Sequence, residues 1–188
     1  MSNQKIYLSP SKQATNSYCV GKTNEQREME ALAKLIKKLL DKAAICETVI
    51  ATSRLTIDLQ GRAREAKNHE CELYLALHSN AGGPGIASGA VAFYHPAQAA
   101  GKKLAARIIS NLHKICPVKS NRSAPLQNGM AAFSGYGLAE IRNPSKLGMI
   151  AVLAETDFHD NSRTAQWMIN NKEKIAIAYV EAIRESWV

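Results

Sequence analysis

Two ionisable residues, His78 and Glu155, each stand where an apolar run of the sequence ends, after residues 73–77 and 150–154. A neutral imidazole in such a place is well suited to bind a metal ion, although it can equally hydrogen-bond the following loop. A carboxylate there is costly without a partner, so we expect a perturbed pKa that suits a general base. A glutamate turned toward solvent is the structural alternative. Together the two residues indicate metal-dependent hydrolysis.

Two further residues are candidates for the same site. Glu25 opens a segment with helical periodicity and shares a face with Met29, Leu32 and Ile36, so it should point inward. Its alternative role is to place favourable charge at a helix N-terminus. His159 lies four residues beyond Glu155 and can reach the same cleft from a loop, or it is an ordinary surface histidine.

The hydrophobic pattern predicts the elements that must position these residues. We expect helices that begin after N-caps at Thr23 or Asn24, and at Thr56 or Asp58. An irregular stretch, 116–149, is expected to hold a hairpin around 138–142. The predicted strands are 5–8, 47–52, 73–77, 89–94 and 150–155, and the predicted helices are 25–43, 58–68, 98–115, 163–169 and 172–187.

Strands that alternate with helices predict an α/β fold. We expect a single domain over residues 1–188, with a mostly parallel twisted sheet and helices on both faces. Such sheets bind ligands at the carboxyl ends of their strands, which is where His78 and Glu155 are expected.

The net charge of the chain is +8, from 24 Lys and Arg against 16 Asp and Glu. This balance favours an anionic polymer as partner. The basic residues are scattered rather than clustered, so nucleic acid is not indicated. The sequence has neither a transmembrane stretch nor a signal peptide, so we expect synthesis in the cytoplasm and no membrane partner.

Several segments together resemble a known family, the zinc-dependent N-acetylmuramoyl-L-alanine amidases of the amidase-3 type. These enzymes occur as autolysins, sporulation and germination amidases, and phage endolysins. Glu25 is similar to the family's ligand glutamate. The other matching segments are 52–54, 59–68, the histidine motif at 75–81, 141–144 and the glutamate segment at 151–161.

The resemblance implies a peptidoglycan hydrolase that cleaves the amide between N-acetylmuramic acid and L-alanine of the stem peptide. Zn²⁺, held by Glu25 and His78, would activate a water, and Glu155 would be the general base. Asn80, in the histidine motif, would bind substrate. The partner would be peptidoglycan of the bacterial cell wall.

The sequence departs from the family after the first strand, where members usually carry a ligand histidine and residues 8–16 have none. We expect His159 to supply the missing ligand, with the amide oxygen of Gln13, a poorer zinc ligand, as the alternative. A third possibility is a non-catalytic pseudo-amidase that binds peptidoglycan or regulates another protein. A catalytic domain without a signal peptide resembles a phage-type endolysin, which acts on the wall after release by phage or lysis. A cytoplasmic bacterial amidase that acts during sporulation would look similar.

Overall fold

The computed structural model describes residues 4–52 and 58–186, and its centre is one six-stranded sheet with the order β2-β1-β3-β6-β4-β5. β1, β2, β3 and β6 run parallel, whereas β4 is antiparallel to β6 and parallel to β5. The predicted α/β fold with a mostly parallel sheet is confirmed. The strands are β1 (Lys5–Pro10), β2 (Glu47–Ile50), β3 (Leu73–Asn80), β4 (Val91–Tyr94), β5 (Leu126–Asn128) and β6 (Ile150–Phe158).

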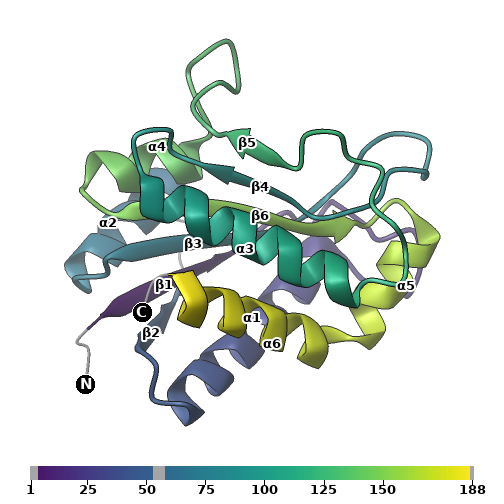
Figure 1. Cartoon of the computed structure of the whole chain (residues 1–188), viewed down its shortest axis with the longest axis horizontal. Helices are drawn as coiled ribbons and strands as arrows, with labels where there is room; N and C mark the ends of the chain where they lie inside the picture. The colour runs from purple at the N-terminus through teal and green to yellow at the C-terminus, as the bar shows by residue number, and fades with distance from the viewer. Residues whose placement is uncertain (1–3, 53–57, 187–188) are drawn as a thin grey trace.

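Helices cover both faces of this sheet (Figure 1). One face packs against α1, α3 and α6, and the other packs against α2 and α4. No helix in the described part of the chain is long and apolar enough to cross a membrane. The helices are α1 (Glu25–Lys42), α2 (Leu59–Asn68), α3 (Ala99–Ile115), α4 (Ala139–Lys146), α5 (Ser162–Asn170) and α6 (Lys172–Ser186).

The central strand β3 is buried on both faces because its apolar residues alternate between two cores. Leu75 and Leu77 belong to the core under α1, α3 and α6, whereas Tyr74 and Ala76 belong to the core under α2 and α4. Side chains alternate along a strand, so His78 continues the row of Tyr74 and Ala76. It comes one residue after the last pair between β3 and β1, so its ring lies just past the end of β1.

Side-chain caps set the first residue of α1 and of α2. Asn24 accepts a hydrogen bond from the backbone N–H of Arg27, and Asp58 accepts one from Gly61. These two caps satisfy N–H groups that have no partner within the helix. They confirm two of the expected cap residues. Thr56, and residues 53–54 of the segment that resembles the amidases, lie outside the described residues.

The structure differs from the sequence-based expectation in several places, one of which is the strand β5 within the stretch 116–149 that was expected to be irregular. The expected hairpin at 138–142 is wrong, because these residues begin α4. This helix has no side-chain cap and contains Pro144, so packing of the buried Ile141 on the second core, rather than a local signal, supports it. In addition, β3 and β6 run three residues further than expected. His78 and Glu155 therefore lie within paired strands, directly opposite one another.

Candidate active site

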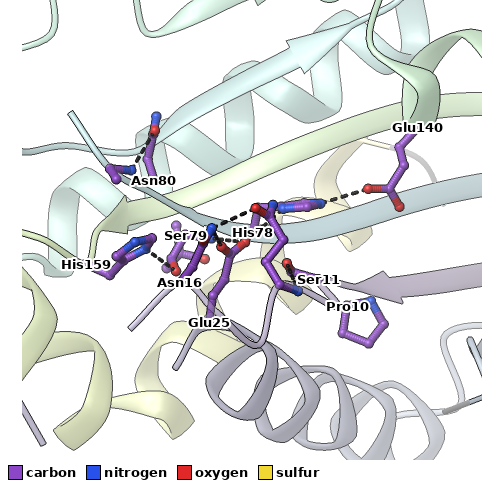
Figure 2. Close-up of polar contacts among 12 residues, drawn as sticks. Pro10, Ser11, Asn16, Glu25, His78, Ser79, Asn80, Glu140 and His159 are labelled. Carbon is purple, nitrogen blue, oxygen red and sulfur yellow. Dashed lines mark hydrogen bonds and ion pairs between the residues drawn. The ribbon is translucent and has the colours of Figure 1, made fainter. Parts of the chain in front are cut away.

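The imidazole of His78 hydrogen-bonds a carboxylate at each of its two nitrogens (Figure 2). Nδ1 lies 2.9 Å from Oε1 of Glu25, which is the first residue of α1. Nε2 lies 2.8 Å from Oε2 of Glu140, in the first turn of α4. All three residues are buried. Because α1 and α4 cover opposite faces of the sheet, this one ring connects both helical layers.

Both contacts favour the charged forms of the three groups. Burial by itself lowers the pKa of His78, but the hydrogen bonds to Glu140 and Glu25 outweigh it and hold that pKa well above its usual value. Burial raises the pKa of Glu25 and of Glu140, but in each case the hydrogen bond and charge of His78 outweigh it and lower the pKa. Charge as well as hydrogen bonding therefore holds these three side chains together.

Glu140 is itself held by a group of polar side chains. Its Oε1 accepts a hydrogen bond of 2.6 Å from Ser9 and lies 2.9 Å from the hydroxyl of Tyr74. The buried Arg62 donates to Ser9 Oγ at 2.6 Å and lies 3.8 Å from Glu140 Oε1. A buried carboxylate is tolerated only with such partners. The two oxygens thus have separate partners, since Oε2 is bonded to His78.

The second carboxylate oxygen of Glu25, Oε2, hydrogen-bonds a residue of the loop that follows β1. Asn16 Nδ2 donates to Glu25 Oε2 at 2.8 Å and to Gln13 Oε1 at 2.7 Å. Gln13 is exposed, and its amide oxygen therefore lies two hydrogen bonds away from the buried cluster.

Glu155 differs from the other two carboxylates because its Oε2 is buried and has no hydrogen-bond partner. Burial, together with the charges of Glu25 and Glu140, raises the pKa of Glu155 to about 7, although His78 opposes this shift. A carboxyl with that pKa is half protonated near neutral pH and can take up and release a proton there.

His159 lies on the far side of Ser79 from His78 (Figure 2). Its Nδ1 is 2.9 Å from Ser79 Oγ, and its ring stacks on Tyr18 with 5.2 Å between centroids. The backbone N–H of Ser79 reaches Oε1 of Glu25 at 3.4 Å. His159 is thus linked to the cluster through Ser79, which hydrogen-bonds both His159 and Glu25.

Asn80, which also belongs to the histidine motif, lies at the end of β3 beyond an irregularity in the pairing with β6. It is partly exposed, and its side chain accepts a hydrogen bond of 2.8 Å from the backbone of Ala81. The structure thus brings Glu25, His78 and Glu155 together, while Asn80 and His159 flank them.

The donor set matches a divalent cation in charge and type but supplies only two ligands. An imidazole nitrogen and a carboxylate oxygen, from His78 and Glu25, meet at one point, and the unpartnered Oε2 of Glu155 lies in the same negatively charged surroundings. Within residues 4–52 and 58–186, however, no three His, Cys, Asp or Glu side chains are arranged to hold a metal ion. Any third protein ligand must therefore be another residue type or require a side chain to move.

Sequence reasoning missed Glu140, Ser9, Tyr74 and Arg62. Glu140 belongs to the stretch expected to be irregular, where no pattern indicates its burial. The strand expected at Tyr74 is confirmed, but a strand pattern cannot tell a packed tyrosine from one whose hydroxyl bonds a carboxylate.

Comparisons with known proteins identify the family of the chain. The family model Amidase_3, described as N-acetylmuramoyl-L-alanine amidase, matches residues 6–185. No curated protein sequence matches the chain.

Solved structures share the fold at low identity. The catalytic domain of CwlV, an N-acetylmuramoyl-L-alanine amidase from Bacillus (Paenibacillus) polymyxa var. colistinus, superposes with a TM-score of 0.77 at 20% identity and 97% coverage of both chains. AmiC2 of Nostoc punctiforme gives 0.77 at 15% identity, covering 98% of this chain and 97% of its own. An amidase from Clostridium difficile 630 gives 0.75 at 20% identity, with the same coverage. Because the family model matches nearly the whole length of this chain, the chain belongs to the Amidase_3 family of peptidoglycan amidases.

Proposed function

We propose that this protein is a zinc-dependent N-acetylmuramoyl-L-alanine amidase that cleaves the amide between N-acetylmuramic acid and L-alanine, and that residues 1–188 form one catalytic domain. The observation that carries this proposal is the unpartnered, buried Oε2 of Glu155, close to the Glu25–His78 pair. Leaving a buried carboxylate oxygen without a partner lowers stability, and such groups recur where proton transfer takes place.

Glu25 and His78 are the proposed ligands of zinc, through the oxygen and nitrogen that already lie 2.9 Å apart. A bound zinc ion supplies a lowered pKa for a bound water and polarises the scissile carbonyl. Glu155 takes the proton of the attacking water and passes it to the leaving amine. Asn80, at the partly exposed end of β3, is proposed to contact the substrate. The products are a glycan strand and a free stem peptide.

The third ligand remains a choice between His159 and Gln13. His159 has to give up its hydrogen bond to Ser79 if it uses Nδ1, whereas Gln13 has to move inward from its contact with Asn16. Imidazole is the better zinc ligand, which favours His159. Zinc content of His159→Ala and Gln13→Ala, measured on purified protein, decides between them, because only loss of the true ligand lowers metal retention.

The decisive experiment is release of stem peptides from purified cell walls, with and without a chelator. We expect the new amino terminus of each released peptide to be L-alanine, with activity lost on chelation and restored by zinc. Glu155→Gln should stay inactive under both conditions. Peptide release that continues undiminished in chelator would contradict the zinc mechanism.

The second candidate is a pseudo-amidase that binds peptidoglycan without cleaving it. This candidate is favoured because the described His, Cys, Asp and Glu residues include no group of three that could hold a metal ion. Metal analysis separates the two candidates, since a pseudo-amidase without a metal site retains less than one zinc per chain while still sedimenting with cell walls.

Wall affinity has a candidate location beside α4. The residues that line a groove of about 600 Å³ between α2 and α4 include the basic Arg64, Arg142 and Lys146, the exposed Tyr136 and the acidic Asp58. Three cations in one groove favour an anionic wall polymer. We expect binding to walls to weaken as salt rises. A role as an endolysin that reaches the wall after lysis is consistent with such charge-based attachment and is part of this proposal.

A further inference from the structure

We propose that Glu140 is a positioning residue, which holds the Nε2 side of His78 so that Nδ1 faces Glu25. This inference rests on the proposed function, because it concerns how the zinc ligand is oriented. It adds a residue that the family resemblance did not supply and that makes no contact with substrate or metal in the proposed arrangement.

The first argument is the geometry of the imidazole. Its nitrogens point away from each other, and each has one carboxylate partner, at 2.9 Å for Glu25 and 2.8 Å for Glu140. A histidine ligand is usually oriented by the hydrogen bond that its other ring nitrogen donates, often to a carboxylate. With Nε2–H given to Glu140, Nδ1 is the nitrogen left for a metal shared with Glu25.

The same geometry argues against Glu140 as the missing third ligand. An ion held by Nδ1 of His78 and by Glu25 lies on one side of the ring, whereas Glu140 bonds the opposite side (Figure 2). The carboxylate would have to leave His78, Ser9 and Tyr74 to reach that ion.

The second argument is that residues other than His78 hold the carboxylate of Glu140 in place. Ser9 and Tyr74 hold Oε1, and Arg62 holds Ser9, so Oε2 is directed at the imidazole. These groups come from β1, β3 and α2, and none of them is on α4. A histidine ligand whose hydrogen-bond partner is held in this way keeps its position without reorganisation when the metal binds.

The test compares Glu140→Ala with Glu140→Gln and uses two readouts. The glutamine keeps an oxygen that can accept from Nε2–H, while alanine removes the acceptor. We expect Glu140→Ala to bind zinc roughly 10–100-fold more weakly in competition with a chelator, as is typical when the partner of a ligand histidine is lost. Glu140→Gln should recover most of that loss.

The second readout needs no metal. In protein labelled with ¹⁵N-histidine, His78 Nε2 should show the chemical shift of a protonated nitrogen in the wild type and in Glu140→Gln. In Glu140→Ala, Nε2 loses its acceptor, so its proton should exchange rapidly with water and its signal should broaden. Wild-type zinc affinity in Glu140→Ala, or an Nε2 proton that is undisturbed in that variant, would overturn the proposal.

Two sets of control variants distinguish a specific effect on His78 from a general loss of folding. Glu28→Gln changes another buried glutamate of the molecule, which bonds Thr23 and Lys172 away from His78, and it should leave both readouts unchanged. If Glu140→Ala fails to fold, Ser9→Ala and Tyr74→Phe each remove one partner of Glu140, and each should weaken zinc binding several-fold. If the wild type binds no zinc at all, the proposed function fails, while the ¹⁵N measurement still tests the role of Glu140.

Discussion

Two carboxylates, of Glu155 and Asp157, lie two residues apart on β6, and their surroundings differ sharply. Asp157 Oδ1 accepts hydrogen bonds from the backbone N–H groups of Gly89 and Phe158, at 2.9 and 2.8 Å, and Cys116 Sγ lies 3.6 Å from Oδ2. Glu155 has a buried Oε2 with no partner. Burial raises the pKa of both groups. Burial alone therefore does not mark the functional carboxylate.

What separates the two groups is the kind of partner. Asp157 ties β6 to the backbone at Gly89, which makes it part of the scaffold. Glu155 faces side chains that are charged, namely Glu25, Glu140 and His78, and keeps one oxygen available. With Glu155 as the proposed general base, the comparison indicates that an unsatisfied oxygen next to charged side chains is a better sign of chemistry than a shifted pKa.

The largest expected effect is on catalysis. Glu155→Gln should lower kcat for peptide release by about 10²–10⁴-fold, the usual contribution of a general base, while zinc content stays unchanged. Asp157→Asn, as the matched variant, should stay within about threefold of the wild type because it can still accept both backbone hydrogen bonds. Comparable losses in the two variants would remove the distinction between these carboxylates.

For the free energy of unfolding, we expect the larger loss from substitution of Asp157 rather than of Glu155. Asp157→Ala leaves the buried N–H groups of Gly89 and Phe158 without their acceptor, so we expect a loss of about 2–4 kcal/mol in the free energy of unfolding. Urea denaturation followed by circular dichroism measures it. An Asp157→Ala protein as stable as the wild type would show that this carboxylate is not structural.

The pH dependence of stability sharpens the same contrast in metal-free protein. The folded-state pKa of Glu155, about 7, lies above its ordinary value of 4.5, so the folded state binds this proton more tightly than the unfolded state. That contribution is complete below about pH 4.5 and is lost as the pH rises through 7. Glu155→Gln should therefore be more stable than the wild type by about 1–3 kcal/mol at pH 8, with the difference vanishing near pH 4.5. A constant difference across this range would mean that Glu155 does not titrate there.

The smallest expected effect on stability is that of replacing Cys116, whose thiol lies next to the carboxylate of Asp157. Its contact with Asp157 Oδ2 is long, at 3.6 Å, and the residue is partly exposed. Cys116→Ala should therefore change the free energy of unfolding by less than about 1 kcal/mol and leave peptide release unchanged. A larger loss would show that the thiol is a required partner of Asp157.

Much of the scaffold could be predicted because its signals are local. The apolar runs that form β3 and β6 and the caps Asn24 and Asp58 are readable from short windows of sequence. His78 and Glu155 are identifiable because they end such runs. Glu140 could not be identified, because its importance depends on Ser9, Tyr74 and Arg62, and on a helix that packing on the second core supports. The third ligand of the proposed zinc site could not be chosen from the sequence, because no sequence pattern states which loop side chain can reach His78.

The position of His78 between the two helical layers also governs when the site can exist. Its partners lie 53 residues before it and 62 residues after it in the chain. Contacts of such long sequence separation form only after the intervening loops have closed, and chains fold progressively as the ribosome releases them. A nascent chain that ends before α4 and β6 therefore has neither Glu140 nor Glu155 in place. With Glu155 as the general base that we propose, a chain that ends before β6 should release no stem peptide from cell walls.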